Sequence, residues 1–180
     1  ISDAYKLNKQ NVDDLKNFVR KDVPDVTQPV DINEVLKSAL ALVSNMVYKT
    51  TKNFSVRYGK NIPPIKGNFQ RLEQVVINLI QNACQALPDN EKSIRVSTFS
   101  DQEEATVVLR INDQGRGIPA ENLPHITDPF FTTKHDSGGV GLGLSISERI
   151  VEEHGGRIFF ASRVGKGTQV EVILPIDENS

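Results

Sequence analysis

The sequence has little cysteine and no long apolar run, and these absences exclude several classes of protein. Its single cysteine, Cys84, cannot form an internal disulfide, so we expect a small buried hydrophobe in a reducing, cytoplasmic compartment. No stretch approaches the ~20 apolar residues of a membrane span, and we expect no signal peptide in these residues. Because the chain begins at Ile1 without a methionine, we expect a fragment of a longer protein, whose membrane anchor, if it has one, lies elsewhere.

An excess of positive charge is also missing. The sequence has 21 Lys and Arg against 23 Asp and Glu, a formal net charge of −2. No basic run is interleaved with aromatic residues, so we expect no nucleic-acid partner. With 38% hydrophobic and 24% charged residues, the 180-residue chain has the composition of one globular domain with a short appendage.

Hydrophobic periodicity divides the chain into an appended helix and a globular domain. Apolar side chains recur at helical spacing over 2–21, within an N-terminal segment of residues 1–23. An acidic linker, 24–30, separates this segment from the domain expected at 31–177. Asp31 and Glu34 predict a capping box at the first helix of that domain. The apolar face expected on this helix comprises Val35, Leu36, Ala39, Leu40, Leu42, Val43, Met46 and Val47.

The rest of the domain alternates between strand and helix patterns. We expect a strand at 54–59, a helix at 68–87, and a hairpin of strands at 93–100 and 104–113. A long loop at 114–141 precedes a helix at 142–154 and two strands at 157–163 and 168–176. This order predicts an α+β fold, a two-layer α/β sandwich. Its mixed, mostly antiparallel sheet would have three helices on one face, besides the appended N-terminal helix.

Three amides form a polar stripe on the helix expected at 68–87. Gln74, Asn78 and Asn82 are spaced four residues apart, beside a strongly apolar face. Neutral amides offer a carbonyl acceptor and an NH₂ donor, which suits a magnesium or phosphate site. The alternative is that they cap or bridge neighbouring polar groups.

A second polar segment, DQGRGIP at 113–119, directly follows an expected strand. Gly115 and Gly117 would let the backbone approach a flat ligand, and a buried Asp113 could accept from an exocyclic amine such as that of adenine. The alternative is a simple turn, since Asp, Gly and Pro are turn residues.

Two further segments contain residues suited to anions. Glycines cluster at 138–143 before a helix, where backbone N–H groups and the helix dipole favour an anion. Neither a βαβ unit nor the Gly-Lys-Ser/Thr ending of a P-loop accompanies them. In DPFFTTK, at 128–134, two phenylalanines could anchor in the core a loop whose hydroxyls and ammonium meet phosphate oxygens; the alternative is a surface loop.

In this order, the segments resemble the catalytic ATP-binding domain of sensor histidine kinases. That domain shares its Bergerat-type fold with the gyrase, heat-shock chaperone and mismatch-repair ATPases. NLIQNACQAL matches the asparagine box, DQGRGIP the first glycine box, DPFFTTK the phenylalanine box, and GVGLGLSI the second glycine box. The closing strand pair is matched by GKGTQVEVILP, and FFTTK and GLGLSI are most similar to the nitrogen-regulator-like subclass.

The resemblance implies a role for individual residues towards ATP and Mg²⁺. Asn82 would bind Mg²⁺, Asn78 would lie beside it at the phosphates, and Asp113 would hold the adenine amine. Gln85 stands where many relatives have lysine, which leaves one phosphate contact open. The implied ATP-binding residues are Asn78, Asn82, Gln85, Asp113, Gly115, Gly117, Ile118, Phe131, Thr132, Thr133, Lys134, Gly139, Val140, Gly141, Leu142, Gly143, Leu144 and Thr168.

The residue at position 78 favours one activity within this superfamily. In the hydrolytic members of the superfamily that this chain resembles, the corresponding position is a glutamate, which activates water as a general base. The amide of Asn78 has no useful proton affinity for that task. We therefore expect a protein histidine kinase that transfers the γ-phosphoryl group of ATP to a histidine. The alternatives are a nucleotide-dependent interaction module and a related ATPase.

The histidines and the first helix indicate which partners to expect. His125, His135 and His154 all follow the asparagine helix, and we expect loop or structural roles for them rather than a phosphoacceptor role. Residues 1–23 resemble the second arm of a dimerisation and phosphoacceptor hairpin, so the acceptor would lie outside this fragment; the alternative is a linker helix docked on the domain. The implied partners are that hairpin domain, a response-regulator receiver domain and, in the full-length protein, a second copy of the chain.

Overall fold

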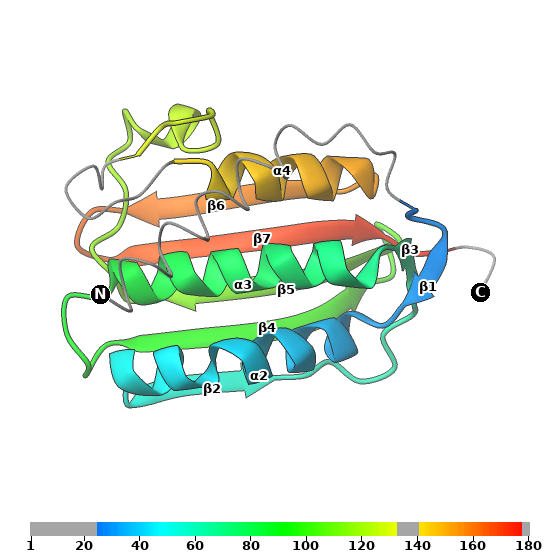
Figure 1. Ribbon diagram of the computed structural model, residues 1–180, viewed down its shortest axis with the longest axis horizontal. Helices are drawn as coiled ribbons and strands as arrows, with labels where there is room; N and C mark the ends of the chain where they lie inside the picture. Colours follow the sequence, from blue (N-terminus) through cyan, green and yellow to red (C-terminus); the bar gives the residue numbers. More distant parts are fainter. Residues whose placement is uncertain (1–24, 133–140, 178–180) are drawn as a thin grey trace, which may run out of the picture.

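The computed structural model describes residues 25–132 and 141–177 (Figure 1). The helix expected at 2–21 lies outside the described residues. The same is true of five residues singled out above, Thr133, Lys134, His135, Gly139 and Val140.

A five-stranded mixed sheet forms one layer of the domain. Its order is β2 (Asn53–Arg57), β4 (Ser93–Asp101), β5 (Thr106–Asp113), β7 (Gly167–Pro175) and β6 (Arg157–Arg163). β2 and β4 are parallel, and the other neighbours are antiparallel, including the expected β4–β5 hairpin. Successive strand residues point to opposite faces, so Val107, Leu109 and Ile111 of β5 all enter the main core.

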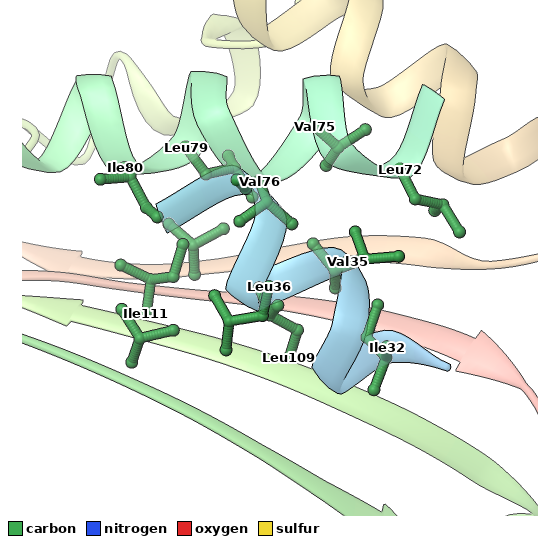
Figure 2. Packing of buried hydrophobic residues seen from close by; sticks show 14 of the residues in the cluster. Ile32, Val35, Leu36, Leu72, Val75, Val76, Leu79, Ile80, Leu109 and Ile111 are labelled. Atoms are coloured by element: carbon green, nitrogen blue, oxygen red, sulfur yellow. The ribbon is translucent and has the colours of Figure 1, made fainter. Parts of the chain in front are cut away.

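Three helices cover one face of this sheet, α2 (Ile32–Thr50), α3 (Phe69–Ala86) and α4 (Gly143–Glu153) (Figure 1). Leu36 of α2 and Val76 of α3 lie with Leu109 and Ile111 of the sheet in the hydrophobic core (Figure 2). The predicted α+β sandwich is therefore confirmed. Among the described residues, no helix has the length and apolar character needed to cross a membrane.

A small second sheet was not expected. β1 (Gln28–Val30) pairs antiparallel with β3 (Ile65–Gly67), so the last three residues of the segment expected as a linker are part of a strand. Strands of three residues are too short to show a periodic pattern. Val30 and Ile65 lie opposite each other in this pair, and both are buried in the core.

The first helix of the domain differs from expectation in two details. Asp31 caps α2 by accepting from the backbone N–H of Asn33 at 2.7 Å, while Glu34 pairs with Lys37 at 2.6 Å, so no capping box forms. Leu42, expected on the buried face, is 67% exposed. Among the described helices, α2 lies at the border of the layer with α3 on one side, and its opposite side has no neighbour among them (Figure 1).

His154 joins the end of α4 to the start of α3, which confirms a structural role. Its Nε2 accepts from the backbone N–H of Asn68 at 2.9 Å, and its Nδ1 donates to the carbonyl of Ile150 at 2.6 Å. This pair of hydrogen bonds requires the neutral ring. Gly155 then ends the helix with φ +69°, and the N–H of Gly156 donates to Val151 O at 2.9 Å, as in a Schellman motif.

Candidate functional site

The predicted motifs meet at one end of the sheet. The last residue of β5 lies beside the first residues of β7, and the carboxyl end of α3 and the amino end of α4 are found at the same end (Figure 1). The segment after β5, which includes a short 3-10 helix at Leu123–His125, lies beside the amino end of α4. The fold thus gathers segments that are far apart in the sequence.

Asp113 is the buried carboxylate of this site. Its Oδ1 accepts from the backbone N–H of Gly115 at 2.7 Å and from that of Thr168 at 3.3 Å, and the residue is 8% exposed. Burial raises the pKa of Asp113 above its ordinary value, and the two N–H donors partly oppose this rise. No described residue donates to Oδ2, so that oxygen is available to accept from a ligand.

Three glycines are required around Asp113. A Cβ on Gly115 would lie 2.7 Å from the Cβ of Ala86 on α3, and one on Gly117 would lie 2.1 Å from the carbonyl oxygen of Arg163. Gly167, which the sequence analysis did not single out, has φ +96°, and a Cβ there would lie 1.9 Å from the carbonyl oxygen of Asp113. In the sequence, the only indication that Gly167 is required was its position in the turn motif GKGT.

Ser162 on β6 is a second residue that sequence reasoning missed. Its hydroxyl donates to the carbonyl of Gly167 at 3.0 Å and accepts from the backbone N–H of Ile118 at 2.8 Å. Because the proton of Ser162 goes to Gly167, the hydroxyl of Thr168, 2.8 Å away, donates to Ser162. One serine in a strand has no distinguishing pattern, so nothing in the sequence could have indicated this link.

Asn78 lies in the contact between α3 and α4. Its Nδ2 donates to the hydroxyl of Ser147 at 2.7 Å, and a Cβ on Gly143 would lie 2.5 Å from its Oδ1. Asn82, one turn further along α3, is half-buried, and its side chain has no hydrogen-bond partner among the described residues. The spacing of polar residues in the sequence predicted both amides, but no pattern indicated Ser147.

The amino end of α4 offers free backbone donors. Ile146 makes a helical hydrogen bond to Leu142 O at 2.9 Å, so the N–H groups of Gly143 and Leu144 precede the helical ladder. Leu142 makes no side-chain cap, and the whole residue is 1% exposed, whereas Gly143 and Leu144 after it are partly exposed. Such an end favours an anion.

The phenylalanine segment is attached to the second glycine box by its backbone. The N–H of Phe130 donates to Gly141 O at 2.9 Å, and Gly141 has φ +73° with no room for a Cβ beside Phe131 O. The expectation that both aromatics anchor in the core is wrong for Phe130, which is 55% exposed. Phe130 has a positive φ of 68°, whereas Phe131 is half-buried, with its ring centroid 6.2 Å from that of His125.

The remaining predicted residues fall at the border of the site. The side chain of Gln85 is exposed at the end of α3, and its backbone carbonyl accepts from the Arg116 guanidinium at 3.1 Å. Thr132 is half-buried at the last residue described before 133–140.

The donor set fits a magnesium ion that arrives with its ligand. The described residues contain no cluster of three or more His, Cys, Asp or Glu side chains able to hold a metal. Asn78 and Asn82 provide neutral carbonyl oxygens, which bind Mg²⁺ weakly by themselves. Phosphate oxygens would therefore have to supply the negative charge of the metal shell.

Comparison with known proteins gives consistent matches. Residues 67–178 match the family described as histidine kinase-, DNA gyrase B-, and HSP90-like ATPase. The chain is 37% identical over 177 residues to the sensor histidine kinase ZraS of Escherichia coli (strain K12), which covers 97% of this chain and 36% of that protein. The chain thus spans about a third of the length of this curated relative.

Solved structures show the same fold. The catalytic domain of histidine kinase ThkA superposes with a TM-score of 0.72 at 30% identity, covering 82% of this chain and 96% of that one. ThkA in complex with the response regulator TrrA superposes with a TM-score of 0.70 at 27% identity, covering 85% of this chain and 42% of that one.

Proposed function

Because the chain belongs to the histidine kinase-, DNA gyrase B-, and HSP90-like ATPase family and has the fold of a histidine kinase catalytic domain, we propose that it transfers the γ-phosphoryl group of ATP to a protein histidine. The whole protein would be a sensor histidine kinase working in the cytoplasm. Its relation to the nitrogen-regulator-like subclass stays a prediction.

Asp113 would select adenine. Its Oδ1 is occupied by the N–H groups of Gly115 and Thr168, so Oδ2 is left for the exocyclic amine of the base. Gly117 and Ile118 follow in a loop attached to β6 through Ser162, which gives the base a rigid wall. A guanine would present a carbonyl oxygen to the carboxylate and would be rejected.

The phosphates would lie at the amino end of α4. The free N–H groups of Gly143 and Leu144 and the helix dipole favour the polyphosphate, and Asn82 would hold Mg²⁺ through its carbonyl oxygen. When bound, Mg²⁺ would neutralise charge on the transferring phosphoryl group. Thr132, Thr133, Lys134, Gly139 and Val140 are proposed as further phosphate contacts.

The observation that favours phosphoryl transfer over hydrolysis is the presence of an amide, Asn78, fixed in its contacts. Its amide donates to Ser147 and lies against Gly143, so it is fixed at the phosphate end of the site. An amide cannot take a proton from water. A site that binds ATP but leaves water unactivated suits transfer to another nucleophile, for which positioning and charge neutralisation suffice.

The partners follow from this reaction. The acceptor histidine would lie on a helical hairpin, of which we propose residues 1–23 to be the second arm. The linker of the expected 24–30 segment then shortens to 24–27, because the domain already begins with β1 (Gln28–Val30). We also propose that the phosphorylated hairpin passes its group to a receiver domain and that the full-length protein is a homodimer. The ThkA structure with a response regulator supports the receiver as a partner by analogy.

The test is a transfer assay with separated parts. The chain is incubated with γ-labelled Mg-ATP and a separately produced phosphoacceptor hairpin from the full-length protein. Acid-labile, base-stable label on the hairpin is expected, because phosphohistidine has that chemistry. A hairpin with its acceptor histidine replaced by alanine is the control and should stay unlabelled. Rapid release of free phosphate without labelling would contradict the proposal and favour an ATPase.

A further inference from the structure

Asn78 is held by two residues one turn apart on α4. Its Nδ2 donates to Ser147 Oγ at 2.7 Å, and its Oδ1 lies against Gly143, where a Cβ would come within 2.5 Å. Ser147 is 1% exposed, so water does not compete for this hydrogen bond. The amide is planar, and fixing Nδ2 at Ser147 therefore directs Oδ1 towards Gly143 and the amino end of α4.

This orientation decides which atom of Asn78 faces the nucleotide. A carbonyl oxygen next to phosphate oxygens is unfavourable, but it is a good acceptor for a metal ion or for the waters around it. The reverse orientation would present an NH₂ group, which would bind a phosphate oxygen directly and exclude a cation. The observed orientation therefore fits a nucleotide that carries Mg²⁺.

We propose that Ser147 is a positioning residue that holds the Asn78 amide with its carbonyl oxygen towards the Mg²⁺ shell of the bound nucleotide. The inference rests on the proposed function, because it requires the phosphates to lie at the amino end of α4. Ser147 acts through Asn78 and touches neither the base nor the transferred group.

A second serine of the same helix, Ser145, has only a local structural role and can be compared with Ser147. Ser145 is also buried, and its hydroxyl donates to the carbonyl of Leu142 at 2.9 Å within its own chain turn. A helix serine commonly bonds its own backbone in this way. Ser147 instead accepts from α3, a segment 69 residues away, which ties it to the site rather than to its own helix. Ser145→Ala is thus a matched control for Ser147→Ala.

The first measurement is nucleotide binding with and without Mg²⁺. In the wild-type chain, Mg²⁺ is expected to strengthen binding of a non-hydrolysable ATP analogue in calorimetry. Ser147→Ala should lose about tenfold or more of this strengthening while its metal-free binding is unchanged, and Ser145→Ala should keep it. Full strengthening by Mg²⁺ in Ser147→Ala would overturn the proposal, as would a loss of the same size in Ser145→Ala.

A second measurement follows the amide directly. The side-chain NH₂ signals of Asn78 in the NMR spectrum should shift and exchange faster with water in Ser147→Ala, and should stay in place in Ser145→Ala. Ser147→Cys keeps a weak acceptor of similar size, so it should show intermediate signals and intermediate binding; if Ser147→Ala does not fold, this variant decides. Unchanged Asn78 signals in both Ser147 variants would overturn the proposal.

The transfer assay separates this inference from the proposed function. At saturating Mg-ATP, Ser147→Ala should lower the rate of hairpin labelling by about tenfold to a hundredfold, the size expected for a misplaced group. A wild-type chain that binds Mg-nucleotide but never labels the hairpin would contradict the kinase proposal, while the Mg²⁺ dependence of binding would still decide the role of Ser147. A wild-type chain whose nucleotide binding ignores Mg²⁺ would overturn the inference.

Discussion

Asp113 and Thr168 face each other on β5 and β7, and the backbone N–H of Thr168 donates to Oδ1 of the Asp113 carboxylate at 3.3 Å. The carboxylate is therefore part of the sheet register as well as a candidate ligand for adenine. Gly167 passes directly over the Asp113 carbonyl, which requires a residue without a side chain. Thr168 and Gly167 at the start of β7 thus hold in place the carboxylate that we propose to bind the base.

Because of this arrangement, we expect Asp113→Asn to weaken nucleotide binding strongly and to change the stability of the fold only slightly. The Oδ1 of asparagine can still accept from Gly115 and Thr168, so the free energy of unfolding should change by no more than about 1 kcal/mol. Its NH₂ group, however, would face the amine of adenine, and affinity for ADP should fall about tenfold to a hundredfold. Calorimetry and chemical denaturation measure the two effects.

The control for this variant is Asp101→Asn. Asp101 is at the other end of the same β-hairpin, where its Oδ1 accepts from the backbone N–H of Glu103 at 3.0 Å. It should bind ADP as the wild type does. Wild-type affinity in Asp113→Asn would refute the role assigned to that carboxylate.

Asn82→Ala should remove the dependence of nucleotide protection on Mg²⁺. A ligand at a hundred times its dissociation constant stabilises the folded state by about 2.7 kcal/mol, which is readily seen in thermal unfolding. Without the Asn82 oxygen, Mg²⁺ should add nothing to the protection by ADP alone. Gln74→Ala, in the same polar stripe of α3, should keep the wild-type response; unchanged protection in Asn82→Ala would refute its role as a metal ligand.

Gly117 and Gly165 form a natural pair for testing the base-site loop. Both have positive φ, +72° and +73°, but a Cβ on Gly117 would lie 2.1 Å from Arg163 O, whereas Gly165 has no heavy atom within 4 Å of that position. Gly165→Ala should cost about 1–2 kcal/mol of unfolding free energy from backbone strain alone. Gly117→Ala should cost about 3 kcal/mol or more and weaken ADP binding, because strain and a backbone clash add. Equal losses in the two variants would contradict the close approach.

Because His154 is buried in its neutral form, we expect the free energy of unfolding to fall in mild acid. Burial lowers the pKa of His154 below its ordinary 6.5, the Arg71 guanidinium lowers it further, and the hydrogen bond to Ile150 and the charge of Glu153 oppose this. The unfolded chain therefore takes up a proton at a higher pH than the folded chain. The free energy of unfolding should keep its full His154 contribution above about pH 6.5 and lose it as the pH falls below that value.

Denaturation curves between pH 7.5 and 5 test this expectation. His154→Gln should be less stable at pH 7.5, by about 1 kcal/mol for a lost or weakened hydrogen bond, and should depend less on pH. The exposed His125 is the control, and His125→Gln should retain the wild-type loss. An identical pH dependence in wild type and His154→Gln would show that another group is responsible.

Several features of this protein were determined by the sequence alone. Helical and strand periods are local properties, so α2, α3, α4 and the two hairpins were all predicted near their observed positions. The polar exceptions within these patterns, Asn78, Asn82 and Asp113, also pointed to the site, because neutral amides and a strand-end carboxylate stand out against apolar neighbours. The order of the four boxes then indicated the family.

Other features were decided only by the tertiary structure. The exposure of Leu42 depends on which side of α2 has a neighbour, and the short β1–β3 ribbon depends on two segments that meet only after folding. Ser147 and Ser162 are ordinary serines in the sequence, and they act through partners 69 and 44 residues away. A local pattern records which face of an element is apolar, but the partner of a single buried hydroxyl is set by how distant elements pack, and only the folded chain contains that information.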